Sequence, residues 1–482
     1  MEKKDENEYI TVKKGENFSE WYSQVLLKSG FIDHSEVSGC LVFRPSAYGT
    51  WQIVMDAVDK EFKEDGVEDT YFPLLIPERF LRKEQEHLEG FSPEVAWVTH
   101  TGDSKLEERL AIRPTSETIM YVSFAKWIRS WRDLPIRYNQ WNNVLRWEFK
   151  HPVPFIRSRE FLWNEGHSVF ATKEEAIKER DSILNIYEKV LREYLALPGI
   201  VGKKTDKEKF AGAVETYSIE HIMPDGWAIQ GPDHHFDGQN FSKAFGIKFL
   251  DKSGNSDYGW QTTYAISTRE LGTMVATHGD DKGLVIPPKV AYIQAVIVPI
   301  YKKGNEAAVN DYAREVYKSL KGHCRIKLDD REGYTPGYKF NDWEMKGIPI
   351  RIEIGAREME SKSVVVVRRD TGQKKEVKME HLVKSIGSEF EEMQESMYRK
   401  AEGFLKSHIH EAKDYDDFKN IIKEKGGIIH APWCGSRECE DKVKEETSAK
   451  ITNIPIKQGK PSGKCIYCGK KAEFMANFAR SY

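Results

Sequence analysis

The sequence contains no run of eighteen apolar residues, so we expect no helix that crosses a membrane. Residues 1–8 are charged and lack the apolar stretch of a signal peptide, and no lipidation signal stands at the other end. A strong net charge is also lacking, because 76 acidic residues offset 73 lysines and arginines to leave −3. We therefore expect a cytoplasmic protein with no membrane partner, in which any nucleic acid is met by local basic patches.

The composition is that of a folded protein. Hydrophobic residues make up 39% of the chain, aromatic residues 12% and charged residues 31%, which is typical of globular proteins. At 482 residues the chain exceeds the size at which a single hydrophobic core stops growing. We therefore expect one large domain with one or two smaller ones. The sequence contains no internal repeat or low-complexity tract.

The order of the expected elements changes near Pro287 and Pro288. Before them, residues 18–283 mix helices and short strands without regular alternation, which indicates one large α+β domain. After them the alternation of strands and helices predicts a three-layer α/β domain and a hairpin that turns at 370–372. The expected elements are strands at 292–300, 325–328, 349–354 and 364–367, helices at 306–320 and 338–346, and a helical stretch at 381–410. We expect domains at residues 1–285, 286–395 and 396–482.

Four of the six cysteines lie near the end of the sequence, spaced as C-x4-C and C-x2-C. They are Cys434, Cys439, Cys465 and Cys468. Two close pairs in a cytosolic chain indicate a structural zinc site with four thiolate ligands, and glycines 435 and 469 allow the tight turns. Two disulfides or four free thiols are the alternative. We expect no ligand from His408, His410 or His430, and we expect Cys40 and Cys324 to be ordinary buried residues.

Residues 139–167 predict two strands around a loop that contains proline. Arg146 and Glu148 stand at the end of the first strand, where a spacing of two places both side chains on one face. With Arg157 of the loop they can hold a phosphate and an amine or purine. An ordinary ion pair on a solvated sheet face is the alternative reading of an Arg-x-Glu pair.

Two further segments favour an anion-binding site. Residues 267–272 (STRELG) end a strand and open a helix, which places Arg269 at a helix N-terminus. Residues 113–117 (RPTSE) precede a helix whose expected apolar face consists of Met120, Phe124, Trp127, Ile128 and Trp131. On its own, the second segment indicates only a helix start with proline, a hydroxyl cap and an acidic first turn.

These segments resemble the motifs of class II aminoacyl-tRNA synthetases. Residues 146–157 resemble motif 2, residues 267–269 resemble motif 3, and residues 71–75 resemble the end of motif 1. Further stretches are similar to the prolyl-tRNA synthetases of the archaeal and eukaryotic type, namely RPTSE at 113–117, FLWNEGH at 161–167, GQNFSK at 238–243, YTPGYKF at 334–340 and KGIPIRIE at 346–353. The resemblance covers nearly the whole chain.

The resemblance implies an α+β fold with three parts. The first is a class II catalytic core, an antiparallel sheet with flanking helices. An α/β anticodon-binding domain and a C-terminal α/β zinc-binding domain follow it. The implied reaction joins L-proline and ATP into prolyl-adenylate and pyrophosphate, and the prolyl group then passes to the 3′ end of tRNA(Pro). Because motif 1 lies at a subunit contact in this family, a homodimer is also implied.

Residue roles follow from the same resemblance. No protein nucleophile is needed, so catalysis depends on alignment and on positive charge, supplied by Arg146 and Arg269. Mg²⁺ is expected to bridge the ATP phosphates. The residues implied for proline binding are Thr115, Glu117, Arg146, Trp163, Glu165, His167, Phe210 and His235. Those implied for ATP binding are Arg146, Glu148, Arg157, Gln230, Asp233, Ser267 and Arg269.

Arg351, Glu353 and Arg357 lie on or just past an expected strand of the α/β domain. Side chains there can read unstacked anticodon bases, although ordinary solvated strand ends are nearly as good an interpretation. About 120 residues separate Glu148 from Arg269, which leaves no room for an inserted editing domain.

One segment departs from the family pattern. Residues 231–238 read GPDHHFDG where the family usually reads Gly-Thr-Ser-His before its Leu-Gly-Gln-Asn-Phe run. Asp233 thereby adds a negative charge near the expected proline and ATP sites. Two alternatives therefore stay open, a class II synthetase for another amino acid and a non-catalytic paralogue that binds RNA. The second is disfavoured by the costly charge clusters that the chain retains.

Overall fold

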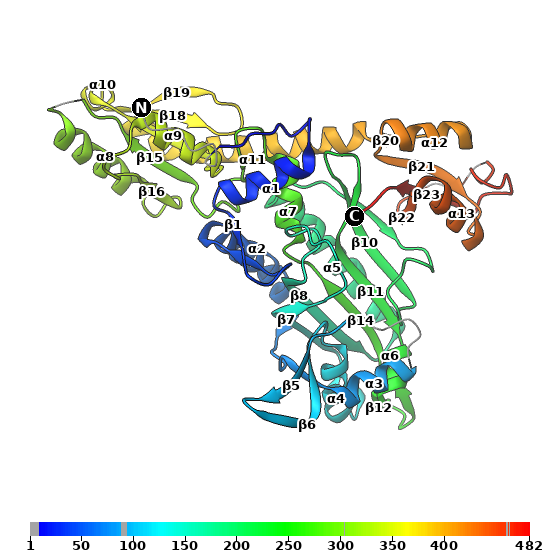
Figure 1. Cartoon of the computed structure of the whole chain (residues 1–482). Helices are drawn as coiled ribbons and strands as arrows, with labels where there is room; N and C mark the ends of the chain where they lie inside the picture. Colours follow the sequence, from blue (N-terminus) through cyan, green and yellow to red (C-terminus); the bar gives the residue numbers. More distant parts are fainter. Residues whose placement is uncertain (1–8, 88–93, 303, 459–460, 462) are drawn as a thin grey trace.

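A computed structural model describes residues 9–87, 94–302, 304–458, 461 and 463–482 (Figure 1). Eleven strands form one sheet through these residues, in the order β20-β21-β23-β22-β9-β10-β11-β14-β8-β7-β3. Every pairing is antiparallel except those of the two outermost strands, β20 and β3. The bounds are β3 Glu68–Asp69, β7 Ile136–Leu145, β8 Glu160–Phe170, β9 Ile200–Lys203, β10 Glu215–Ile222, β11 Ala228–Gly238, β14 Trp260–Ala265, β20 Ile409–His410, β21 Ile428–Trp433, β22 Lys450–Pro455 and β23 Phe474–Ala479.

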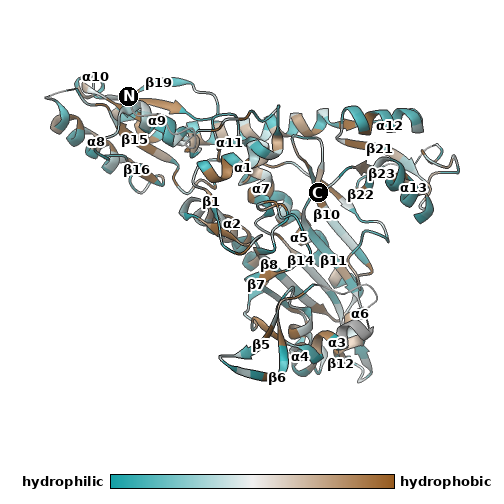
Figure 2. Ribbon diagram, in the orientation of Figure 1, coloured by the Kyte–Doolittle hydropathy of each residue, from teal (hydrophilic) through white to brown (hydrophobic). Residues whose placement is uncertain are grey.

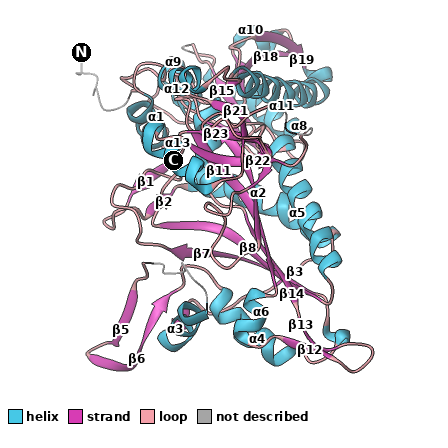
Figure 3. Ribbon diagram, turned by 90° about the vertical axis from the view of Figure 1, so that its right-hand side faces the viewer, coloured by secondary structure: helices cyan, strands magenta, loops and turns pink. Residues whose placement is uncertain are grey.

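Four helices cover the middle of this sheet and enclose the main hydrophobic core. They are α1 (Phe18–Lys28), α2 (Pro45–Glu64), α5 (Lys173–Glu193) and α7 (Arg269–His278). Trp21, Trp51 and Tyr187 of these helices are fully buried there. The start of α5 is defined by a capping box between Thr172 and Glu175. Figure 3 shows α5 running along the sheet, on the face that its apolar residues cover.

A second apolar cluster lies under α4 (Glu117–Trp127) and α6 (Asn240–Phe245), where Met120 and Phe124 pack against Phe241. The sequence predicted a helix that reaches Trp131, but α4 ends at Trp127. Ile128 is already extended, and Trp131 belongs to a separate 3-10 turn. Trp127 remains half exposed. Smaller sheets and one helix complete the core: β1 Ile32–His34 with β2 Leu41–Phe43, β4 Leu75–Pro77 with β5 Trp97–Thr101 and β6 Ser104–Ile112, β12 Lys248–Leu250 with β13 Ser256–Tyr258, and α3 Glu78–His87.

The α/β domain is confirmed with three layers. Its five-stranded sheet has the order β16-β15-β17-β18-β19. In the inner strand β15, which Figure 2 colours as hydrophobic, Ala295 and Ile297 face α8 while Val296 and Val298 face α9. This alternation places a helix on each face. The bounds are β15 Ala295–Pro299, α8 Glu306–Leu320, β16 Ile326–Leu328, α9 Pro336–Met345, β17 Ile350–Ile354, α10 Ala356–Glu360, β18 Ser363–Arg368, β19 Lys374–Lys378 and α11 Leu382–Ser407.

The last segment of the chain joins the sheet of the core. It contains β20 to β23 with α12 (Tyr415–Glu424) and α13 (Arg437–Thr447), and β22 pairs with β9 of the core. The domain boundary expected at residues 395/396 lies inside the continuous helix α11. Between Glu148 and Arg269 the described chain consists of strands and helices of the core, without an inserted domain. No helix among the described residues is both long and apolar enough to cross a membrane.

Candidate functional site

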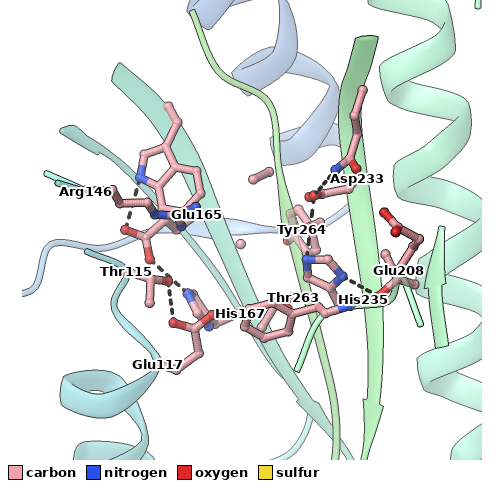
Figure 4. Close-up of a pocket in the computed structure, with 16 residues that line it drawn as sticks. Thr115, Glu117, Arg146, Glu165, His167, Glu208, Asp233, His235, Thr263 and Tyr264 are labelled. Carbon is pink, nitrogen blue, oxygen red and sulfur yellow. Dashed lines mark hydrogen bonds and ion pairs between the residues drawn. The ribbon is translucent and has the colours of Figure 1, made fainter. Parts of the chain in front are cut away.

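A cavity of about 240 Å³ opens on one face of the sheet, between β8, β11 and β14 and the segment before α4. Ten of the residues predicted from the sequence line it. They are Thr115, Glu117, Arg146, Trp163, Glu165, His167, Phe210, Gln230, Asp233 and His235. Figure 4 shows these side chains converging from two walls, with Glu165 on one side and Asp233 on the other.

The first wall is strand β8. Trp163, Glu165 and His167 alternate along it, so a period of two directs all three side chains into the cavity. Gly166 lies between them, where a Cβ atom would come within 1.9 Å of the Tyr264 ring of the neighbouring strand. A side chain at Gly166 would therefore push β14 away from β8 and open the floor of the site.

Glu165 is the centre of a hydrogen-bond network. Its buried carboxylate accepts from the backbone and hydroxyl of Ser116, at 2.8 and 3.0 Å, and from the side chains of Asn142 and Trp163, at 2.9 and 3.1 Å. His167 Nε2 lies 3.3 Å away. Burial opposes ionisation, but the bonds from His167, Asn142 and Ser116 outweigh it and lower the pKa of Glu165. The cavity therefore holds a fixed carboxylate.

Residues 113–117 bring a second carboxylate to this wall. The buried Arg113 guanidinium donates to the carbonyl oxygens of Phe72 and Asn143, at 3.0 and 2.8 Å, and so holds the segment against β7. Thr115 donates its hydroxyl to Glu117, and both side chains line the cavity. Arg113 thus has a structural role here, and Thr115 and Glu117 face the ligand space.

Arg146 supplies positive charge at the mouth of the cavity. Its Nε donates to the Pro114 carbonyl at 2.9 Å, and its guanidinium lies 5.0 Å from the centre of the Trp163 ring. Within the described residues, no carboxylate oxygen lies within 4.0 Å of this guanidinium. A cation that is fixed in place but has no acid partner is suited to an anionic ligand.

The opposite wall comes from β10 and β11. The Phe210 ring stacks on His235 with centroids 4.6 Å apart, and His235 Nδ1 lies 2.9 Å from the Thr216 hydroxyl. Burial lowers the pKa of His235, so the ring is neutral. Asp233 accepts from the Gln230 amide at 2.8 Å and lies 3.7 Å from His235 Nε2. Residues 231–238, which depart from the family pattern, therefore place a carboxylate directly in the cavity wall.

The other predicted ATP residues do not line this cavity. Arg269 lies beside it, donating to the carbonyl oxygens of Gln230 at 3.0 Å and Ile156 at 3.3 Å. Ser267 accepts from the Arg269 backbone at 3.3 Å. Arg157 lies in the neighbouring loop, with its guanidinium 5.8 Å from the Phe149 ring. Arg269 thus joins the 153–157 loop to β11 at the edge of the site.

The expectation that Arg146 and Glu148 share one face of a strand is wrong. Strand β7 ends at Leu145. Arg146 still donates its backbone N–H to Arg159 at 2.8 Å, but Trp147 donates to Glu94 at 3.0 Å and so leaves the ladder with β8. Arg146 consequently turns to the cavity, whereas Glu148 is exposed.

Six lining residues were not predicted from the sequence: Gly166, Glu208, Thr216, Thr263, Tyr264 and Ala265. Thr216 faces the cavity because it pairs with His235, and Thr263 because it pairs with His167. Strand register of this kind leaves no signal in one sequence. Thr263 and Ala265 do stand four and two residues before Ser267 in an expected strand, so their shared face was open to prediction.

In the α/β domain, a smaller cavity of about 190 Å³ is lined by Arg351 of β17 together with Arg368, Arg369 and Lys374. Glu353 lies beneath, accepting from Arg351 at 2.9 Å and from Lys374 at 3.1 Å. Arg357 is exposed on α10 and does not line this cavity. The structure therefore brings Arg351 and Glu353 together and leaves Arg357 apart.

The four cysteines of the last segment form one cluster, with their sulfur atoms all within 4.8 Å of one another. Cys434 Sγ lies 3.6 Å from Cys439 Sγ and 3.7 Å from Cys468 Sγ, so these are neither disulfides nor dispersed thiols. Gly435 and Gly469 have positive φ angles of 79° and 71°, as expected for the tight turns. Among the described residues, no histidine joins this cluster. Cys40 and Cys324 are half-buried rather than fully buried.

Comparison with known proteins defines the class first. A family model described as the tRNA synthetase class II core domain (G, H, P, S and T) matches residues 97–278, which include the cavity. Models described as an anticodon binding domain and as the C-terminal part of prolyl-tRNA synthetase match residues 294–389 and 415–482. The class II core, the anticodon-binding domain and the C-terminal domain predicted from the sequence are thereby confirmed.

Full-length relatives define the family. Proline-tRNA ligase 2 of Clostridioides difficile is 45% identical over 99% of this chain and 100% of its own length. The proline-tRNA ligase of Cenarchaeum symbiosum is 47% identical over 98% of this chain and 99% of its own. A crystal structure of prolyl-tRNA synthetase from Cryptosporidium parvum, complexed with halofuginone and AMPPNP, has 44% identity and a TM-score of 0.94, covering 98% of this chain and 100% of that one. The chain belongs to the prolyl-tRNA synthetases, a family of aminoacyl-tRNA ligases.

Proposed function

We propose that this chain activates L-proline with ATP and transfers the prolyl group to the 3′ end of tRNA(Pro). The observation that carries the proposal is the arrangement of charge in the cavity, where the unpaired Arg146 guanidinium faces the carboxylates Glu117 and Glu165. An imino acid is a zwitterion, with an ammonium and a carboxylate that match these two charges. Phe210 and Trp163 provide apolar surface for the ring.

Arg146 and Arg269 are the residues that we assign to the reaction itself. The proline carboxylate attacks the α-phosphorus of ATP, the bond from the α-phosphate to the pyrophosphate breaks, and pyrophosphate leaves. Arg146 meets the carboxylate and the α-phosphate, while Arg269 and Arg157 meet the outer phosphates. Glu117 with Thr115 accepts hydrogen bonds from the proline ammonium. No side chain forms a covalent bond in this scheme, so positioning and charge carry the catalysis.

Mg²⁺ enters with ATP in this proposal. Among the described residues, the one cluster with the spacing of a metal site is that of the four cysteines, and no carboxylate cage lies at the cavity. This fits a cation that keeps several waters and is held mainly by the nucleotide phosphates. Its contribution is to neutralise phosphate charge. Gln230, Glu148 and Ser267 are the weaker candidates for contacts to the nucleotide.

The cysteine cluster fits a structural zinc ion. A tetrahedral site with zinc–sulfur bonds of about 2.3 Å has sulfur atoms about 3.8 Å apart. The separations of 3.6 and 3.7 Å from Cys434 are close to that value. Four thiolates leave no open position, so the zinc has no part in the reaction.

Amino acid dependence of pyrophosphate exchange tests the proposed activity. With labelled pyrophosphate and ATP, we expect proline to support exchange at least ~100-fold better than other amino acids, because a site that pairs both charges of proline also limits ring volume. Exchange driven by a different amino acid would identify another substrate. The altered choice of amino acid would then be assigned to the cavity wall that contains Asp233. Absence of exchange with all twenty would identify a non-catalytic paralogue.

We also propose a homodimer formed through residues 71–75, which resemble the end of motif 1. Tyr71, Leu74 and Leu75 are exposed apolar residues there, and Tyr71 is 70% exposed. Light scattering should give about twice the chain mass of 55.7 kDa. Leu74→Asp should shift the protein to monomer, whereas Val383→Asp, at an equally exposed position of α11, should leave the mass unchanged. A monomeric unmodified protein would contradict this proposal.

Anticodon binding is assigned to residues 286–395, with the core at 1–285 and the zinc-bearing part at 396–482. Arg351 is the residue we favour for reading a base, because it lines a cavity with four other cationic residues, Lys282, Arg368, Arg369 and Lys374. Glu353 orients it and can accept from a base amino group. Arg357 is kept as a candidate for a backbone phosphate.

A further inference from the structure

A third cavity, of about 440 Å³, lies where the catalytic core, α11 and the α/β domain meet. It shares no lining residue with the cavity described above. Its walls come from the segment before α1, the end of α7, the residues after β10, one side of α11 and the hairpin turn at 370–371. Its volume falls within the range of small-molecule sites, which favour the boundaries between domains.

One wall of this cavity is apolar. Met397, Ala401 and Phe404 are spaced along α11 so that they share one face of the helix. Ile222 and Val285 of the core face the same space and are buried. An apolar ligand body of several carbon atoms therefore has a surface to lie against.

Lys14 forms the inner end. Its Nζ donates to the carbonyl oxygens of Gly279 at 2.8 Å and Thr277 at 3.3 Å, which caps the C-terminus of α7. An ammonium has three N–H donors, and two of them are used by these carbonyls. The Nζ atom also lies 4.8 Å from the centre of the Trp21 ring. Burial first, and then the charge of Lys400, lower the pKa of Lys14 to about 8. Two positive charges thus lie near each other at this end.

Two lysines and two aspartates line the cavity, and they differ in their partners. Both carboxylates that line it are held by arginines: Asp280 accepts from Arg369 at 2.6 and 2.8 Å, and Asp370 accepts from Arg368 at 2.8 and 3.0 Å. In contrast, across the described part of the chain no carboxylate lies within 4.0 Å of the Nζ atom of Lys14 or Lys400. Each carboxylate of the lining thus has an arginine partner, whereas neither lysine has a carboxylate in direct contact with its Nζ atom.

We propose that this cavity binds a small amphipathic anion, whose carboxylate, sulfonate or phosphate group meets Lys14 and Lys400 while its apolar body lies along α11. The ligand touches the core through Lys14 and the α/β domain through Thr371, so its binding stabilises one arrangement of these two parts. This site is separate from the proposed active site, and its occupation does not depend on the proposed reaction.

Titration of the full chain with 1-anilinonaphthalene-8-sulfonate, followed by fluorescence, tests the proposal. This probe joins a sulfonate to an apolar aromatic body. We expect saturable binding of one probe per chain, and Lys400→Met should weaken it about tenfold by removing a charge-assisted contact. Lys384→Met removes a lysine of the same helix outside the cavity, so it should bind the probe as the unmodified protein does. Because Lys400 is exposed, we expect the Lys400→Met variant to fold normally.

Two further measurements separate this site from other causes of fluorescence. Ser396→Trp introduces a large side chain at the exposed rim of the cavity and should also weaken the binding of the probe. Uncharged N-phenyl-1-naphthylamine should bind at least ~tenfold more weakly than the sulfonate. Equal affinity of Lys400→Met and the unmodified chain, equal affinity for the uncharged probe, or displacement of the probe by ATP with proline would each overturn the proposal.

Discussion

Arg146→Ala should reduce proline-dependent pyrophosphate exchange by about 10³-fold or more, which is the effect of removing one group that stabilises charge in a transition state. Arg146 is the unpaired cation of the cavity, and its side chain is directed inward by the Pro114 carbonyl. Prolyl-adenylate formation in a single turnover should fall by the same factor, since the loss lies in the chemical step.

The thermal stability of Arg146→Ala should stay close to that of the unmodified protein. Nε of Arg146 makes one hydrogen bond to a backbone carbonyl, which contributes about 1 kcal/mol. Arg399→Ala is a suitable control, because Arg399 pairs with the exposed Glu395 on α11, away from the cavity, and the variant should keep full exchange. Near-normal exchange by Arg146→Ala would refute the assignment of the reaction to this cavity.

Elements that carry their own signals were open to prediction from sequence. The helix at 306–320 was predicted with the bounds that the structure gives, because its apolar positions repeat on one face and a glutamate begins it. The strands of the α/β domain were found within three residues, since apolar runs alternate there with helices. The cysteine cluster followed from spacing alone.

Features that depend on pairing between distant segments were not open to prediction. The end of β7 at Leu145 is set by the competing contact of Trp147 with Glu94, and no local residue indicates it. The union of the last segment with the core sheet rests on β22 and β9, which are about 250 residues apart in the sequence. Glu208 belongs to the site for the same reason, and Lys450 of β22 holds it at 2.8 Å. The family resemblance supplied residues of both walls, including Phe210 and His235 of the second, whereas Thr216 is placed in the second wall by the register of the sheet.

Zinc should be present at one ion per chain in purified protein, as measured by elemental analysis. Cys439→Ser should lose the metal and lower the melting temperature by several degrees or more, because a structural zinc site contributes folding free energy directly. The cluster connects the end of β21, the start of α13 and the turn before β23. Loss of the metal removes the bonds that hold these three segments together.

The effect of Cys439→Ser should reach beyond the last segment, since β22 pairs with β9 and the next core strand, β10, carries Thr216 into the proposed active-site cavity. We therefore expect exchange activity to fall on mild heating together with the melting of residues 415–482. Cys324→Ser, at a half-buried cysteine in the α/β domain, should keep both zinc and melting temperature. A zinc-free preparation that is folded and melts normally would contradict the metal assignment. Retained activity in a chain whose last segment has melted would show that the shared sheet does not couple the two parts.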